Sequence, residues 1–126
     1  MDFLNMVTEH ENKNLAIDFD GVIHKNSKGF HDGTVYDEPI EGSYEALKEL
    51  SQHYSLIIFS AKARPDRPIV DNKTGIEHIW EWLKKYQMDS FISEVVSEKP
   101  RAIYYIDDKA IQFTNWENTL IQIKNK

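Results

Sequence analysis

The chain has 126 residues, of which 40% are hydrophobic and 29% are charged, and its formal net charge is −6. This length suits one domain with a single hydrophobic core. The acidic balance disfavours non-specific binding to nucleic acid or to anionic membrane surfaces. The absence of cysteine excludes disulfides, thiol catalysis and cysteine-based zinc sites.

No apolar stretch approaches the roughly 20 residues that span a bilayer. Residues 1–14 carry three acidic side chains and lack the apolar run of a signal peptide. We therefore expect a soluble, cytoplasmic protein without a membrane partner.

Short apolar runs alternate with amphipathic segments along the chain. Residues 15–19 and 54–59 are nearly continuous apolar runs, which are typical of strands buried on both faces of a parallel sheet. Residues 91–96 and 102–106 predict a third and a fourth strand. Residues 22–38 contain glycine, histidine and mixed polar side chains, and we interpret them as a long loop or small hairpin.

Two amphipathic segments between the strands predict helices. The first follows Pro39 and Gly42, and the second follows Thr74, whose side chain is suited to cap a helix. Apolar residues recur at helical spacing in both: Tyr44, Leu47 and Leu50 in the first, and Ile76, Ile79, Trp80 and Leu83 in the second. Residues 61–73 predict a polar loop. The tail, residues 116–123, fits either a short helix or a strand.

Strands that alternate with helices indicate βαβ units and a parallel sheet. Ligands of such sheets bind beyond the carboxyl ends of the strands. Asp18 and Asp20 follow the first predicted strand, Ser60 follows the second, and Asp107 and Asp108 follow the fourth. We therefore expect these side chains to gather at one edge, where Lys99 would have to reach across to join them.

Four carboxylates at neighbouring strand ends would raise one another's pKa unless a cation relieved their repulsion. Hard oxygen ligands favour Mg²⁺. Two residues apart on an extended strand, Asp18 and Asp20 would share a face, so one carboxylate could attack a phosphorus atom while the other handles a proton. Ser60 and Lys99 would supply a hydroxyl donor and a positive charge around the phosphoryl oxygens.

Four short motifs resemble those of the haloacid-dehalogenase superfamily and occur in the family's order over most of the chain. Asp18-Phe19-Asp20-Gly21-Val22 resembles its first motif, and Ile58-Phe59-Ser60 resembles its second. Lys99-Pro100 resembles the third, and Tyr105-Ile106-Asp107-Asp108 the fourth. The resemblance implies one Rossmann-like, three-layer α/β/α domain over residues 1–126, with a mostly parallel central sheet.

The resemblance also implies a Mg²⁺-dependent phosphatase. Asp18 would be the nucleophile and a metal ligand, and Asp20 the general acid/base, with its backbone carbonyl on the metal. Ser60 would bind the transferring phosphoryl group, and Lys99 would stabilise the intermediate. Asp108 is expected to bind Mg²⁺ directly, with Asp107 in support.

Two departures from the family pattern concern size. Only Pro100 and Arg101 separate Lys99 from the fourth predicted strand, where most members have a helix. The two usual positions for a cap domain hold only residues 22–38 and one helix with one strand, so we expect no large cap. The open site would admit a phosphorylated small molecule, a nucleotide or a nucleic-acid end, with residues 22–38 acting as a flap.

Other polar residues have a plainer interpretation. His24 and His31 are expected to be solvated loop residues, and Arg64 and Arg67 to lie in an exposed polar loop, although the two arginines would suit a distal charge of a substrate. We assign no function to Trp82 or Trp116.

Two alternative functions remain. A phosphoacceptor signalling domain of the receiver type shares the Ser-Ala and Lys-Pro pairs, but the order of its acidic residues differs. A catalytically silent binding module on the same fold is the other.

Overall fold

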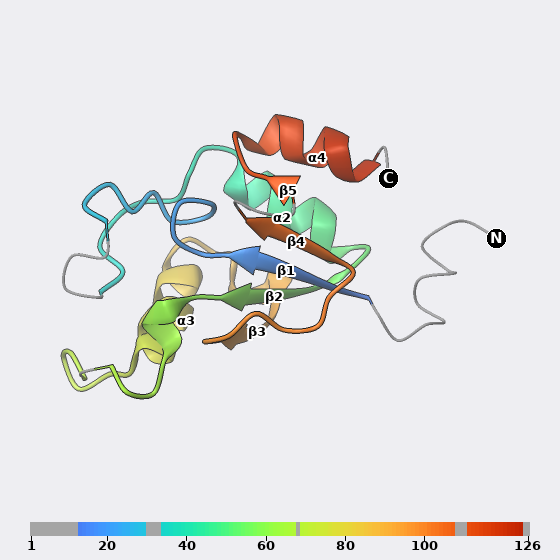
Figure 1. Ribbon diagram of the computed structural model, residues 1–126. Helices are drawn as coiled ribbons and strands as arrows, with labels where there is room; N and C mark the ends of the chain where they lie inside the picture. The colour runs from blue at the N-terminus through green and yellow to red at the C-terminus, as the bar shows by residue number, and fades with distance from the viewer. Residues whose placement is uncertain (1–12, 30–33, 68, 108–110, 125–126) are drawn as a thin grey trace.

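Five strands form one sheet in which each neighbouring pair is parallel (Figure 1). The computed structural model describes residues 13–29, 34–67, 69–107 and 111–124. The strand order is β3-β2-β1-β4-β5, which makes β1 central. The strands are β1 (Asn14–Asp18), β2 (Ser55–Phe59), β3 (Ile92–Val96), β4 (Tyr104–Asp107) and β5 (Ile111–Gln112). The expected α/β domain with a parallel sheet is confirmed, and β5 is a strand that the sequence did not predict.

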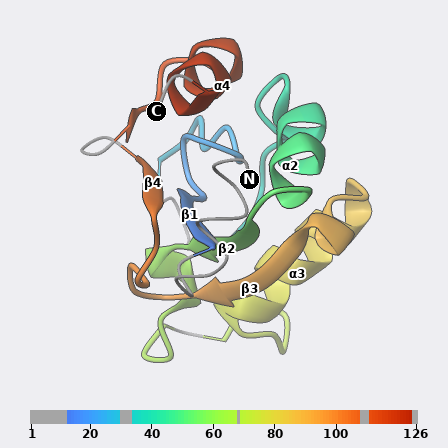
Figure 2. The same ribbon diagram turned by 90° about the vertical axis from the view of Figure 1, so that its right-hand side faces the viewer.

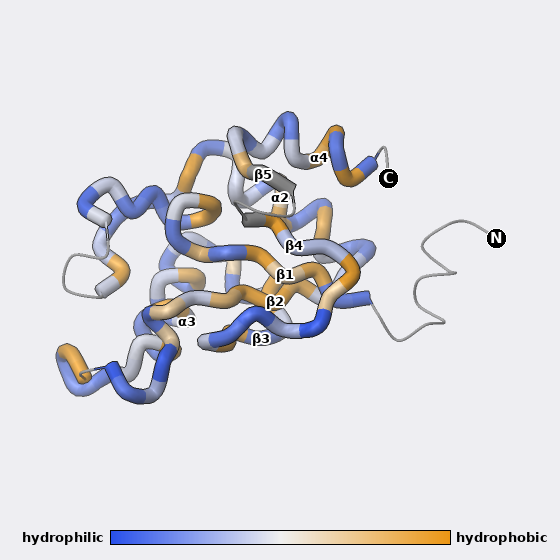
Figure 3. The backbone as a smooth tube through the Cα atoms, viewed as in Figure 1, coloured by the Kyte–Doolittle hydropathy of each residue, from blue (hydrophilic) through white to orange (hydrophobic). Residues whose placement is uncertain are grey.

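The apolar runs form the centre of the sheet because they are buried on both faces. Leu15, Ala16 and Ile17 of β1 have no exposed surface. Ile17 pairs with Ile58 of β2 on one side and with Ile106 of β4 on the other. Figure 3 shows the resulting apolar band along the central strands. The carboxyl ends of β1, β2 and β4 therefore leave the sheet side by side.

Three α-helices and two short 3₁₀ turns complete the described structure. They are α2 (Ser43–Ser51), η1 (Ala61–Ala63), α3 (Gly75–Lys85), η2 (Asp89–Phe91) and α4 (Trp116–Lys124). Both predicted helices are confirmed, and the tail is a helix. α4 contacts α2 and the edge strand β5, whereas α3 contacts η1 and β3, the strand at the other edge of the sheet (Figure 2). No helix in the described ranges has the length and apolar character needed to cross a membrane.

The start of α3 is fixed by its sequence. The Thr74 side chain accepts a hydrogen bond from the Glu77 backbone, and the Glu77 side chain accepts one from the Thr74 backbone. This reciprocal capping box satisfies two backbone donors that the helix itself leaves without a partner. Gly75 is required by a close approach, since a Cβ atom there would lie 1.6 Å from the carbonyl oxygen of Lys62.

Candidate active site at the carboxyl edge of the sheet

The backbone places predicted polar residues from three strands at the same edge of the sheet, as expected. Asp18 is the last residue of β1, Ser60 directly follows β2, and Asp107 is the last residue of β4. The segments that follow β1 and β2 extend from this same edge (Figure 1). The side chain of Asp107, together with Asp108 and His31, lies outside the described part of the structure.

A tight turn after β1 brings His24 back to Asp20. Gly21 adopts a φ of 84°, a left-handed conformation that glycine reaches without strain. The carbonyl oxygen of Phe19 accepts hydrogen bonds from the backbone amides of Ile23 and His24, both at 3.0 Å. The chain therefore curls around Phe19 and turns the His24 ring toward the Asp20 carboxylate.

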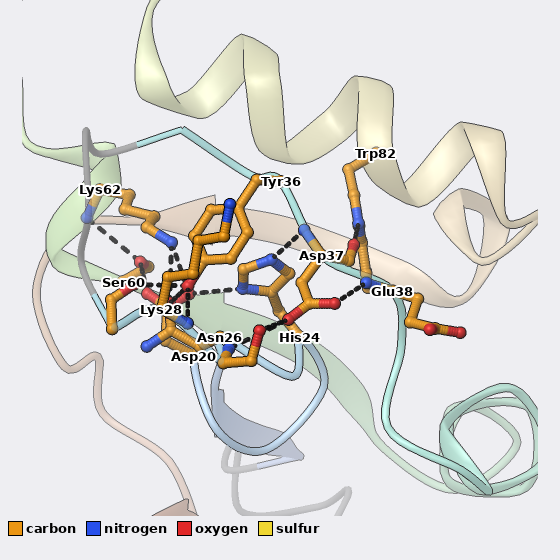
Figure 4. Close-up of polar contacts among 12 residues, drawn as sticks. Asp20, His24, Asn26, Lys28, Tyr36, Asp37, Glu38, Ser60, Lys62 and Trp82 are labelled. Atoms are coloured by element: carbon orange, nitrogen blue, oxygen red, sulfur yellow. Dashed lines mark hydrogen bonds and ion pairs between the residues drawn. The ribbon is translucent and has the colours of Figure 1, made fainter.

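Three side chains hold the carboxylate of Asp20 (Figure 4). Its Oδ1 atom accepts hydrogen bonds from His24 Nδ1 at 3.0 Å and from Lys62 Nζ at 2.9 Å. Its Oδ2 atom accepts one from Ser60 Oγ at 3.3 Å. The structure thus brings Asp20 and Ser60 together as predicted, and adds two partners that the sequence did not suggest.

His24 acts in this cluster as a neutral donor. The backbone N–H of Asp37 donates to Nε2 at 3.0 Å, so the ring proton is on Nδ1, which donates to Asp20. Trp82 Nε1 donates to the Asp37 carbonyl at 2.7 Å and so fixes that peptide. The ring packs against three aromatic side chains, Phe19, Tyr36 and Trp82.

The expectation that His24 is a solvated loop residue is wrong, because the side chain is fully buried. The turn after β1 folds it under Phe19, where aromatic packing replaces water and both ring nitrogens find partners.

Lys62 is the second unexpected member of the cluster. Residues 61–73 were predicted to form a polar loop, yet the Lys62 side chain has no exposed surface. Its ammonium group also donates to Asn26 Oδ1 at 3.3 Å and lies 5.4 Å from the centre of the Tyr36 ring. The turn η1 places it there, because Ser60 Oγ accepts the Lys62 backbone N–H at 3.1 Å. A buried lysine is tolerated only when its charge is paired.

These contacts set the charge state of Asp20. Burial acts to raise the pKa of the carboxyl, but the hydrogen bonds from His24 and Lys62 and the charge of Lys62 outweigh it, so the pKa is lowered from 3.8. Asp20 is therefore a carboxylate at neutral pH. Because Oδ1 already accepts from two donors, Oδ2 is the atom better placed to take up or release a proton.

The two ends of the predicted flap, residues 22–38, are fastened to each other. The Tyr36 hydroxyl accepts the Lys28 backbone N–H and donates to the Gly29 carbonyl, both at 2.7 Å. The Asp37 carboxylate accepts the backbone and side-chain donors of Ser27. With the Glu38 backbone donor, these hydrogen bonds lower the pKa of Asp37 to about 2. The described part of this segment is thus tied down next to Asp20.

Lys99 lies near two aromatic side chains of the sheet. Its ammonium nitrogen lies 5.5 Å from the ring centre of Phe59, at the end of β2, and 5.2 Å from that of Tyr105 in β4. These strands flank β1, whose final residue Asp18 is half-buried. The Lys99 ammonium group therefore lies near side chains of both strands that flank β1, and its role at the site stays a prediction.

Comparisons of the chain with protein-family models, with curated proteins and with solved structures found no match. Among the described residues, no three histidine, aspartate or glutamate side chains form a group that could hold a metal ion. The interpretation of this site therefore depends on the motifs and on the geometry around Asp20.

Proposed function

We propose that this chain is a Mg²⁺-dependent phosphatase of the haloacid-dehalogenase type, built as a Rossmann-like three-layer α/β/α domain without a large cap. It would hydrolyse a phosphomonoester through an aspartyl-phosphate on Asp18. The observation that supports this most directly is the hydrogen bond between Ser60 Oγ and Asp20 Oδ2. It joins the ends of neighbouring strands, 40 residues apart in the chain, as a shared phosphoryl site requires.

The first chemical step follows from the position of Asp18 at the end of the central strand. Asp20 is ionised at neutral pH, so Oδ2 would first take up a proton from solvent. A carboxylate oxygen of Asp18 then attacks phosphorus, the bond from phosphorus to the leaving oxygen breaks, and the proton on Oδ2 of Asp20 passes to that oxygen. Ser60 would donate to a phosphoryl oxygen, and Lys62 and Lys99 would balance its charge.

The second step releases phosphate and restores Asp18. Oδ2 of Asp20 takes a proton from water as the water oxygen attacks phosphorus, and the bond from phosphorus to Asp18 breaks. The lowered pKa of Asp20 keeps it ionised for this step. His24 and Lys62 hold its other oxygen, so the carboxylate stays oriented toward the reacting atoms.

The donors at this edge fit Mg²⁺ by their chemistry. Asp18 and Asp107 end adjacent parallel strands, because Ile17 pairs with Ile106 one residue earlier. Together with the backbone carbonyl of Asp20 they offer the oxygen ligands that this ion prefers. When bound, Mg²⁺ would neutralise charge on the phosphoryl oxygens.

The strand order argues against the signalling alternative. Receiver-type domains have the order 2-1-3-4-5. Here β2 lies between β1 and β3, and β4 lies on the far side of β1. A general base held next to Asp18 would also hasten hydrolysis of a phosphoryl adduct rather than preserve it.

The test is release of phosphate from p-nitrophenyl phosphate, with and without Mg²⁺. The leaving group needs no proton, so the assay probes the nucleophile. Asp18→Asn removes the nucleophile and keeps its shape, and we expect a loss of several orders of magnitude in rate. Asp89→Asn, just before β3 at the opposite end of the sheet, is the matched control and is expected to behave as the native chain.

Two outcomes would contradict the proposal. Turnover that survives in Asp18→Asn within about tenfold would exclude Asp18 as nucleophile. A phosphoryl adduct on Asp18 that persists for hours in the native chain would instead favour the signalling alternative.

A further inference from the structure

A pocket of about 420 Å³ begins at Ala63, which directly follows Lys62 in η1. Its walls come from three segments: the turn η1 with the loop that follows it, the first residues of α3, and the end of β3. Ile69, Ile76 and Val95 give it an apolar lining. Arg64 and Arg67 also line this pocket. The arginines that the sequence placed in an exposed polar loop therefore border a cavity.

The pocket adjoins the proposed phosphoryl site through two backbone contacts. Ser60 donates its backbone N–H to the carbonyl of Val96, a lining residue, at 3.0 Å. Gly75, another lining residue, packs against the backbone of Lys62 so closely that no side chain fits between them. These contacts place the pocket against the backbone of Ser60 and Lys62, two residues whose side chains hold Asp20 in the proposed phosphoryl site.

The charge of the lining is opposite to that of the whole chain. Among the described residues, the lining holds two arginines and no aspartate or glutamate, although the formal net charge of the chain is −6. The backbone amides of Gly75 and Ile76 belong to the first turn of α3, where the helix offers no carbonyl partner and its dipole is positive. The pocket is therefore suited to an anion.

Arg64 already has the geometry that carboxylate binding requires. Its Nε and terminal nitrogens donate to the two oxygens of Asp66 at 3.2 and 3.1 Å. Both side chains are more than half exposed, and such exposed pairs contribute little to stability. An incoming carboxylate or phosphate can replace Asp66 with the same two-point contact.

We propose that this pocket binds the leaving group of the substrate, and that the substrate is a small phosphomonoester whose leaving group combines an apolar face with a second anionic group. Arg64 and Arg67 recognise the anion, a carboxylate or a second phosphate, while the isoleucine and valine side chains contact the apolar face. This inference rests on the proposed phosphatase function and names its substrate class.

The test compares three probes that share one ring: phenyl phosphate, 4-carboxyphenyl phosphate and 1,4-phenylene bisphosphate. We expect the native chain to have a higher kcat/KM for the two charged probes than for phenyl phosphate. In the double variant Arg64→Gln/Arg67→Gln, that ratio should fall about tenfold, the effect of losing a charge-assisted contact. The better of the two charged probes distinguishes a carboxylate from a phosphate as the second anion.

Arg101→Gln is the matched control, because Arg101 is exposed and precedes β4 at the opposite end of the sheet, and its ratio should equal that of the native chain. If the native chain hydrolyses phenyl phosphate but shows no preference for the charged probes, or if the double variant keeps the preference, the pocket inference is overturned and the phosphatase function stands. If the native chain hydrolyses p-nitrophenyl phosphate but none of the three probes, the pocket inference is likewise overturned and the phosphatase function stands. If it hydrolyses neither p-nitrophenyl phosphate nor the probes, the phosphatase function fails, and this inference fails with it.

Discussion

Replacing Lys62 by methionine removes the only positive charge within hydrogen-bonding distance of Asp20 among the described residues. Methionine keeps a similar length and flexibility, so the change isolates the charge. Removing one partner of a fully buried pair costs about 3–5 kcal/mol. Asp20 is 22% exposed and keeps its bonds to His24 and Ser60, which places the expected loss near the lower end, at about 3 kcal/mol.

The measurement is urea unfolding at pH 7, followed by tryptophan fluorescence. A domain of this size is expected to have about 5–15 kcal/mol of stability, so Lys62→Met should fold and unfold at a lower urea concentration with an unchanged slope. Lys25→Met is the matched control, because the pair of Lys25 with Glu38 spans 3.6 Å between exposed side chains. Its effect should stay within about 0.5 kcal/mol.

A double-mutant cycle with Asp20→Asn tests the cause. Once Asp20 is neutral, removing the Lys62 charge should cost about 2 kcal/mol less than it does in the native chain. A loss below about 1 kcal/mol for Lys62→Met, or strict additivity in the cycle, would refute the ion pair as the source of stability.

Three further predictions concern the elements around the site. Gly75→Ala should destabilise the chain by about 3 kcal/mol, seen as a lower Tm, because its Cβ would meet the Lys62 carbonyl. Thr74→Ala should cost about 1 kcal/mol in urea unfolding through loss of the helix cap. Asp37 has a pKa of about 2 in the folded chain, below its usual 3.8. Its contribution to the free energy of unfolding is therefore present above pH 4 and disappears as the pH falls toward 2. In Asp37→Asn, the unfolding free energy should change less with pH in this range. An unchanged curve would show that the hydrogen bonds from Ser27 to Asp37 do not cause this pH dependence.

The sequence predicted the sheet and two helices because burial leaves a simple pattern. Continuous apolar runs became the central strands β1 and β2, and helical spacing after Gly42 and Thr74 became α2 and α3. The strand β5 was missed because two residues are too few for a period to be recognised. The tail stayed ambiguous until packing of α4 against α2 and β5 decided it.

The sequence predicted only those site residues that lie at or just after the ends of strands. Asp20 and Ser60 meet because parallel strands end at one edge. His24 and Lys62 were missed because a histidine or lysine in a polar segment is usually solvated, and only tertiary packing buries these two. Signals were present: His24 follows Asp20 by four residues, with apolar neighbours between them, and Lys62 lies between two alanines just after Ser60.

Lys62 also changes the argument for the metal. The sequence suggested that four carboxylates need a divalent cation, but one of them, Asp20, has its own cation at 2.9 Å. In the proposed site, the need for a cation then comes from Asp18 and the Asp107–Asp108 pair, and Asp20 would contribute only its backbone carbonyl. Asp20→Asn should therefore leave Mg²⁺ affinity within about threefold, whereas Asp18→Asn should weaken it by about tenfold or more. Isothermal titration calorimetry with Mg²⁺ decides between them, since equal losses in both variants would mean that the Asp20 side chain, not its carbonyl, binds the ion.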